Sequence, residues 1–167
     1  MKIIIGNDHG GYGLKLDILK YLQEREIEYQ DVGSHSNDIV RYPYYAVEVA
    51  EAVRNDEDAR GILICSTGIG MSIAANRFKG IRAALCTDSY MAEMTRRHND
   101  SNILCLGGKI TAVREALEIV EIWLNTDYEG GRHDISLDLI SKLEMKTSRD
   151  LERSEFQEFI EQKSGGQ

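Results

Sequence analysis

The sequence predicts a doubly wound α/β domain, in which a Rossmann-like parallel sheet of about five strands is flanked by helices. Short apolar runs recur along the 167 residues and alternate with segments whose apolar residues have helical spacing. The run at 61–65 is apolar on both faces, as expected for a central parallel strand covered by helices. This alternation is typical of a parallel sheet wound on both faces, and the length fits one domain.

The N-terminal part of the chain supplies the first two predicted strands. Residues 2–6 form a short apolar run that ends in glycine. Leu14, Ile18 and Leu22 then share one face of a predicted helix. Residues 27–32 give the second strand, and a polar loop follows it. The chain therefore begins as strand, helix and strand.

The middle of the chain repeats this order. Pro43, the only proline, suits the first turn of a helix. The apolar residues of that helix are Ala46, Val49, Ala50 and Val53. The elements predicted after it are a strand at 61–65, a helix at about 70–78, a strand at 81–86, a helix at about 88–97 and a strand at 102–106. A further helix carries Ala116, Ile119, Val120 and Trp123, and a last one is expected at 135–143.

Polar residues and glycines follow four of the predicted strands. They are Asn7, Asp8 and His9 after the first, Cys65 to Gly70 after the third, Thr87 and Asp88 after the fourth, and Gly107 to Lys109 after the fifth. In parallel α/β sheets, ligands bind beyond the carboxyl ends of the strands. We therefore expect all of these residues to open onto one edge of the sheet.

Composition and charge narrow the function classes. The net charge of −8 is unfavourable for nucleic acid, whose binding depends on basic contacts to phosphates. No apolar stretch approaches the roughly 20 residues of a membrane helix, and the N-terminus lacks a signal-peptide pattern, so we expect a cytoplasmic protein. Cys65, Cys86 and Cys105 include no C-x-x-C pair, which argues against a disulfide framework and a zinc knuckle. We expect the domain to span 1–145, with a charged extension at 146–167 that is partly helical or disordered.

Cys65 ends the central strand, and a Ser-Thr-Gly-Ile-Gly loop at 66–70 follows it. A cysteine in this place is usually a small core residue. Here the two glycines let the loop turn its N–H groups inward where a helix begins. Such donors favour a thiolate and hold an oxyanion on a bound carbonyl, which equips the segment to remove a proton next to a carbonyl. Cys86 and Cys105 have no such loop, and we expect them in the core.

The same loop partly matches a dinucleotide-binding pattern. Gly68, Gly70 and Ile73 approximate G-x-G-x-x-G, and Asp88 lies 20 residues beyond Gly68, where an acid that binds ribose would lie. The third position is isoleucine, however, and the loop follows the third strand. The match is therefore weak. The sequence contains no G-x-x-x-x-G-K-[ST] motif, which leaves nucleoside triphosphate hydrolysis without support.

Asp8 and His9 follow the first strand and admit two interpretations. The structural one is a helix cap for Asp8 and a solvated histidine for His9. The functional one is a carboxylate and an imidazole that bind sugar hydroxyls or exchange protons near neutral pH.

Two further polar groups follow later in the chain. Positive charge at 96–98 suits the C-terminal dipole of a helix, so His98 and Asn99 are ambiguous by themselves. Arg132 and His133 come after two glycines and suit a phosphate, while a simple turn before the last helix is the structural alternative.

Five segments together carry a resemblance. They are GNDHGG at 6–11, RYPYYA at 41–46, ILICSTGIGMSIAANR at 62–77, RRHNDSN at 96–102 and YEGGRH at 128–133. In this order they closely resemble the motifs of the type B ribose-5-phosphate isomerases and the related galactose-6-phosphate isomerase subunits. The resemblance covers about residues 1–144.

The resemblance implies an aldose–ketose isomerase that uses a cis-enediolate intermediate and needs neither a metal nor another cofactor. Cys65 would take the C2 proton, and His98 would open the sugar ring. Thr67 would assist proton movement between the reacting oxygens, and Asp8 is the remaining candidate catalytic residue.

The resemblance also implies the residues that bind the sugar phosphate. They are Asp8, His9, Tyr42, Ser66, Thr67, Gly68, Ile69, Gly70, Asn99, Lys109, Arg132 and His133. Arg132 and His133 match the phosphate side, and Tyr42 borders the pocket. The resemblance further implies a homodimer or tetramer in which the neighbouring subunit completes each site.

Two positions depart from the pattern of this family. Ser136 and Lys109 stand where many members that act on ribose 5-phosphate have arginine, and Lys109 lacks the bidentate fork of a guanidinium. Ribose 5-phosphate is the first choice of substrate. A tetrose, another pentose or a hexose phosphate such as galactose 6-phosphate is the alternative. A nucleotide- or sugar-phosphate-binding module without catalysis is the alternative from another class.

Overall fold

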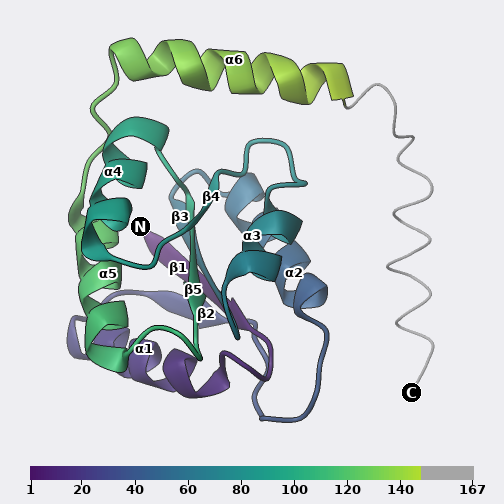
Figure 1. Ribbon diagram of the computed structural model, residues 1–167, viewed down its shortest axis with the longest axis vertical. Helices are drawn as coiled ribbons and strands as arrows, with labels where there is room; N and C mark the ends of the chain where they lie inside the picture. Colours follow the sequence, from purple (N-terminus) through teal and green to yellow (C-terminus); the bar gives the residue numbers. More distant parts are fainter. Residues whose placement is uncertain (148–167) are drawn as a thin grey trace. The chain divides into compact units, whose positions relative to one another are not determined.

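A computed structural model describes residues 1–147 and contains a five-stranded, fully parallel sheet with helices on both faces (Figure 1). The strands are β1 (Lys2–Asn7), β2 (Tyr29–Asp31), β3 (Ala59–Cys65), β4 (Ala83–Leu85) and β5 (Ile103–Gly107). Their order in the sheet is β2-β1-β3-β5-β4. The prediction of a doubly wound α/β fold is confirmed.

Six helices belong to the described residues. They are α1 (Tyr12–Glu24), α2 (Tyr42–Asn55), α3 (Ile69–Ala75), α4 (Ser89–Asn99), α5 (Val113–Asn125) and α6 (Arg132–Thr147). The start predicted for the last helix is wrong by three residues. Gly130 and Gly131 have φ values of 65° and 63°, a left-handed conformation that glycine adopts without strain, and the helix begins directly after them.

Side-chain alternation along the strands builds two cores. Ile3 and Ile5 of β1 pack with α1, α4 and α5, whereas Ile4 packs on the opposite face with α2 and α3. Figure 1 shows these two helical layers on either side of the sheet. Cys65 faces the α2 and α3 layer, and Cys86 faces the other layer.

The strand order sets where a ligand can enter. From β1 the chain moves outward to β2, whereas from β3 it moves to the opposite side of the sheet. The loops that leave β1 and β3 therefore diverge between two neighbouring strands, and ligands of open α/β sheets bind at such a point.

The chain divides into two compact units, Met1–His133 and Asp134–Gln167. The first unit contains the whole sheet. The expected boundary between 145 and 146 remains a prediction, and residues 148–167 of the predicted extension at 146–167 lie outside the described residues. None of the described helices is both long and apolar enough to cross a membrane.

Candidate active site

The loop after β3 fixes the Cys65 thiol. The backbone N–H of Gly68 donates a hydrogen bond to Cys65 Sγ at 3.1 Å. Gly68 has φ +76° and is the N-cap residue of α3, so the chain reverses tightly between the sulfur and the helix. The local sequence Ser-Thr-Gly supplies this geometry because glycine adopts a positive φ without strain. The sulfur thus has a defined orientation at the carboxyl end of a central strand.

Close backbone contacts bring the ends of three strands together. A Cβ at Gly10 would lie 2.2 Å from Ser66 Oγ, so only glycine lets the loop after β1 approach the loop after β3. The N–H of Gly108 donates to Cys65 O at 2.8 Å, and the N–H of Lys109 donates to Ser66 O at 3.1 Å. The loops after β1, β3 and β5 therefore meet at one edge, as the sequence predicted.

Asp8 lies in the loop after β1 and is buried. Its interpretation as a helix cap is wrong, because α1 begins at Tyr12 with Gly11 as the N-cap residue. Asp8 Oδ1 instead accepts a hydrogen bond from the Gly10 N–H at 2.8 Å, and Asn7 Nδ2 donates to Asp8 O at 2.8 Å. These bonds hold the carboxylate beside the loop that carries Ser66.

His9 and Tyr42 border the same edge. His9 is half-buried rather than fully solvated, and its Nδ1 lies 3.3 Å from the carbonyl oxygen of Val40. The Tyr42 ring covers Gly70, where an added Cβ would lie 2.8 Å from the ring. This contact joins the start of α2 to the first turn of α3. Tyr42 is 37% exposed, so one part of its ring remains open to solvent.

The other two cysteines and Asp88 have structural roles. Burial raises the pKa of Cys86 to about 12, and burial also raises the pKa of Cys105 well above its ordinary value. Both therefore stay protonated at neutral pH, as expected of core thiols. Asp88 is the N-cap of α4, where its Oδ1 accepts from the Met91 N–H at 2.8 Å. The dinucleotide-binding interpretation needs the Asp88 carboxylate to bind ribose, but in the structure this carboxylate caps a helix.

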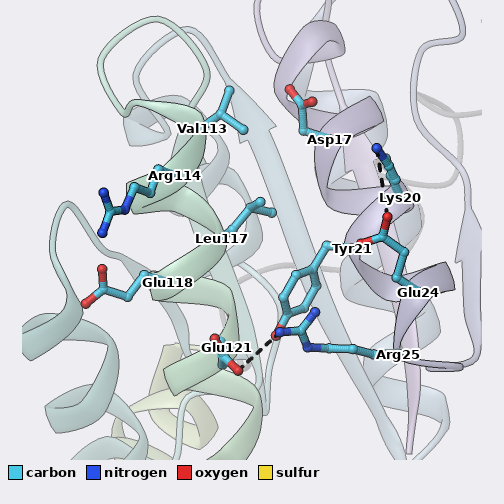
Figure 2. Close-up of a pocket in the computed structure, with 10 residues that line it drawn as sticks. All are labelled: Asp17, Lys20, Tyr21, Glu24, Arg25, Val113, Arg114, Leu117, Glu118 and Glu121. Carbon is cyan, nitrogen blue, oxygen red and sulfur yellow. Dashed lines mark hydrogen bonds and ion pairs between the residues drawn. The ribbon is translucent and has the colours of Figure 1, made fainter.

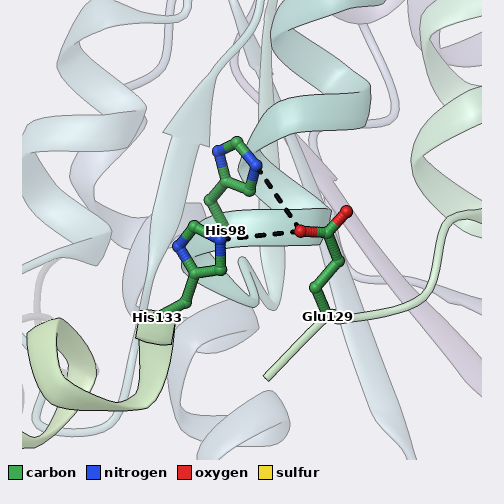
Figure 3. A group of neighbouring side chains, drawn as sticks. All are labelled: His98, Glu129 and His133. Carbon is green, nitrogen blue, oxygen red and sulfur yellow. Dashed lines mark ion pairs between the residues drawn. The ribbon is translucent and has the colours of Figure 1, made fainter. Parts of the chain in front are cut away.

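A second group of predicted residues gathers at the end of α4. The rings of His98 and His133 are stacked, with centroids 4.2 Å apart and planes 13° from parallel. Glu129 lies beside them, and its Oε2 is 3.8 Å from His98 Nε2 and 3.5 Å from His133 Nε2 (Figure 3). Arg132 Nε lies 3.5 Å from His133 Nε2. Asn99 ends α4 and is exposed.

The group around Cys65 lies at the edge of the sheet where the strands end, and the group around His98 lies at the opposite edge, where the strands begin. Helix α4 starts after the carboxyl end of β4 and returns along the sheet, so its last residues lie where β4 and β5 begin. Arg82, directly before β4, donates through Nε to the carbonyl oxygen of Asn99 at 3.1 Å, which places Asn99 at that edge. The structure therefore brings Cys65 together with Asp8, Tyr42 and Lys109, but it does not bring Cys65 together with His98 within one chain.

Three features of this second edge were not predicted. Glu129 is not among the residues that the sequence predicts, although it lies four residues before His133 within YEGGRH. The sequence explains the charge of Arg97 by the helix dipole, but in the structure its guanidinium pairs with Glu129 and, at 2.8 Å, with Glu93. Arg96 is buried and donates to Asp100 Oδ1 at 2.8 Å and to Ser101 O at 2.6 Å. The positive charges at 96 and 97 are therefore held by specific partners.

His98, Glu129 and His133 also form a group of potential metal ligands, because their ligand atoms lie within 4.8 Å of one another. The geometry does not fit a metal ion. An ion bound to histidine lies in the plane of the ring, and two nearly parallel rings whose centroids are 4.2 Å apart do not share such a position. The Arg97 guanidinium on Glu129 would in addition repel a cation.

The groove between α1 and α5 is separate from both edges. Figure 2 shows Tyr21 and Arg25 from the α1 side facing Leu117 and Glu121 of α5. The groove has a volume of about 740 Å³ and is lined by acidic, basic and apolar side chains. None of the predicted site residues lines it, so it contributes nothing to the candidate site.

Comparisons with known proteins agree with the architecture described above. Residues 3–140 match the family model described as Ribose/Galactose Isomerase. The chain is 46% identical over 145 residues to ribose-5-phosphate isomerase B of Escherichia coli (strain K12). The matched region covers 87% of this chain and 97% of that protein. The structure is similar to ribose-5-phosphate isomerase B of Clostridium thermocellum, with a TM-score of 0.86 and 52% identity over 88% of this chain and 99% of that one. It is also similar to ribose-5-phosphate isomerase B of Mycoplasma genitalium with bound ribulose-5-phosphate, with a TM-score of 0.83 and 36% identity over 86% and 96% of the two chains.

Proposed function

Because the chain belongs to the Ribose/Galactose Isomerase family, we propose that it interconverts ribose 5-phosphate and ribulose 5-phosphate. The similar proteins named ribose-5-phosphate isomerase B support an aldose–ketose isomerase that acts on a pentose phosphate. The single structural observation that carries the proposal is the Cys65 thiol, held by the Gly68 N–H at 3.1 Å where the loops after β1, β3 and β5 meet.

The base is the Cys65 thiolate, whose Sγ takes the proton from C2 of the open-chain aldose. The electron pair of that C–H bond becomes the C1–C2 double bond, and the carbonyl electrons move onto O1 to give a cis-enediolate. The proton then returns to C1, and the O2 hydroxyl proton passes to O1 with the help of Thr67. The loop at 66–70 binds the two oxygens. Protein thiols that remain protonated, such as Cys86 and Cys105, do not supply this base.

A second copy of the chain completes the site. Ring opening by His98 and proton transfer by Cys65 must act on the same sugar, yet these residues lie at opposite edges of one sheet. In a dimer, the carboxyl edge of one copy faces the end of α4 of the other. Arg132 and His133 then approach the phosphate from the partner, and the exposed Asn99 becomes available to the sugar.

The resemblance implies that the phosphate side has fewer guanidinium groups than in many members of the family. Arg132 is exposed and interacts with His133, while Lys109 is exposed at the carboxyl edge. Ser136 is exposed and brings no charge. A five-carbon sugar phosphate is the substrate we propose, because similar proteins carry the name ribose-5-phosphate isomerase B.

The test is a panel of four-, five- and six-carbon aldose phosphates, incubated with the purified protein before and after chelator treatment. We expect ribose 5-phosphate to have the highest kcat/KM and the chelator to leave it unchanged. A higher kcat/KM for a tetrose or hexose phosphate would reassign the substrate. Binding of sugar phosphates without ketose formation would support the non-catalytic module instead.

A further inference from the structure

We propose that Glu129 is a positioning residue for ring opening, which turns Nε2 of His98 toward its carboxylate and leaves Nδ1 of that ring for the sugar. This inference rests on the isomerase function proposed above. It concerns a residue outside the predicted site, and its evidence is the arrangement of side chains at the end of α4.

Glu129 is itself fixed from two directions. Arg97 Nε donates a hydrogen bond to Glu129 Oε1, and Arg97 Nη2 forms an ion pair with the same oxygen. The Glu129 N–H donates to the carbonyl oxygen of Arg97 at 3.0 Å. Arg97 is held in turn by Glu93 at 2.8 Å on the preceding turn of α4. The carboxylate is therefore anchored to the same helix that carries His98. A shift of Glu129 relative to His98 would break these bonds.

The second oxygen of Glu129 faces the two stacked rings. Oε2 lies 3.8 Å from His98 Nε2 and 3.5 Å from His133 Nε2, and Figure 3 shows both rings turned toward this carboxylate. The left-handed Gly130 and Gly131 turn the chain between Glu129 and His133, so that both side chains reach the same side of it. The stacking of the rings then limits the rotation of each of them.

The charges around His98 favour one tautomer. Hydrogen bonds from Arg97 hold the pKa of Glu129 below its ordinary value, so the carboxylate is anionic at neutral pH. An anionic oxygen near Nε2 favours a proton on that nitrogen, which leaves the Nδ1 lone pair as the base. The other charged groups at this cluster are Glu93, Arg97 and Arg132, of which Arg132 contacts His133. Glu129 is thus the anion that both rings share.

The kinetic test compares two substrates in the full-length enzyme. Ribose 5-phosphate is mostly cyclic, whereas its 4-deoxy analogue lacks the hydroxyl that closes the ring and stays open. General acid–base catalysis contributes typically about 10²–10⁴-fold, and loss of positioning removes part of it. We therefore expect Glu129→Gln to lower kcat/KM for ribose 5-phosphate roughly tenfold or more and to change that for the analogue less than about twofold.

Two further variants separate positioning from a structural effect. Glu121→Gln removes the carboxylate of another exposed pair with an arginine, Arg25, in the groove that contains none of the predicted site residues, and we expect both substrates to react as with the wild type. Glu129→Gln combined with His98→Asn should lose no more activity than His98→Asn alone, because Glu129 acts through that ring. Equal losses on both substrates, wild-type activity of Glu129→Gln, or fully additive losses in the double variant would overturn the proposal.

A measurement on the free protein is independent of the reaction. Long-range ¹H–¹⁵N spectra of the wild type should show neutral His98 protonated on Nε2, and Glu129→Gln should weaken this preference. Protonation on Nδ1 in the wild type would overturn the proposal even if the enzyme is active. If no pentose phosphate reacts, the isomerase function fails, and the spectra alone decide the role of Glu129.

Discussion

Gly68→Ala tests whether the loop after β3 requires glycine to hold Cys65. Gly68 has φ +76°, a conformation that costs a residue with a Cβ atom about 1–2 kcal/mol. The added Cβ would also lie 2.6 Å from Leu85 Cδ1 and 3.0 Å from the carbonyl group of Leu106, which belongs to the backbone of β5. The Leu85 side chain can move away from such a Cβ, but the backbone of β5 cannot. Overpacking of this kind typically costs about 1–3 kcal/mol.

Gly80→Ala is the matched control. Gly80 has φ +80°, but a Cβ there would find no atom within 4 Å. Both variants carry the conformational cost, and only Gly68→Ala adds the contact with β4 and β5. We expect Gly68→Ala to lower the free energy of unfolding by about 2–5 kcal/mol and Gly80→Ala by about 1–2 kcal/mol.

The assay combines urea unfolding with the turnover of ribose 5-phosphate. The displaced loop would carry the Gly68 N–H away from Cys65 Sγ, and an error of about 1 Å in a reacting group can cost roughly 10²-fold in rate. We therefore expect kcat to fall at least about tenfold in Gly68→Ala and to stay near the wild-type value in Gly80→Ala. Equal unfolding free energies and equal kcat values for the two variants would refute a steric need for glycine at position 68.

Three other changes probe separate parts of the molecule. Lys15→Met leaves Asp31 without the buried ammonium that lies 2.9 Å away, and should lower the unfolding free energy by about 3–5 kcal/mol. Lys20→Met, which removes one partner of an exposed ion pair, should lower it by under about 1 kcal/mol. Equal losses of unfolding free energy in urea would contradict this difference. Burial raises the pKa of Cys86 from 9.0 to about 12, so the stability that its thiol provides is complete below pH 9 and is lost as the pH rises toward 12. The unfolding free energy should therefore fall less steeply between pH 9 and pH 12 for Cys86→Ala than for the wild type. Identical pH dependences of the two proteins would exclude this thiol as the cause. Ser136→Arg should lower the KM for ribose 5-phosphate roughly tenfold with little change in kcat, because a guanidinium adds a charged donor to a remote phosphate; an unchanged KM would mean that position 136 does not face the phosphate.

The alternation of strands and helices was readable from the sequence because buried parallel strands are apolar throughout and amphipathic helices repeat their apolar positions. The edge strands were predicted too long. β2 and β4 have three residues each, and each pairs with only one neighbour. Since an apolar run does not reveal which strands lie at the edge of the sheet, their ends could not be placed.

The candidate site was predictable where it is local. The glycine loop after Cys65 and the polar residues after β1 lie at the ends of strands, so the topology alone brings them together. The partner of His98 could not be predicted in this way. Glu129 lies 31 residues later in the chain, and its approach depends on the bonds to Arg97 and on two left-handed glycines. For Asp88 the sequence was misleading. Its spacing from Gly68 matches that of a ribose-binding acid, but its carboxylate caps a helix.

The assignment of Cys65 as the base is tested most directly by Cys65→Ala and Cys86→Ala, assayed side by side with ribose 5-phosphate in D₂O. The two variants make the same chemical change at two buried cysteines, and both should remain folded. We expect Cys86→Ala to form ribulose 5-phosphate near the wild-type rate, with solvent deuterium at C1 because an enediolate exchanges its proton. We expect Cys65→Ala to lose activity by at least about 10²-fold, since it lacks the group that removes the C2 proton. Wild-type turnover by Cys65→Ala would contradict the account.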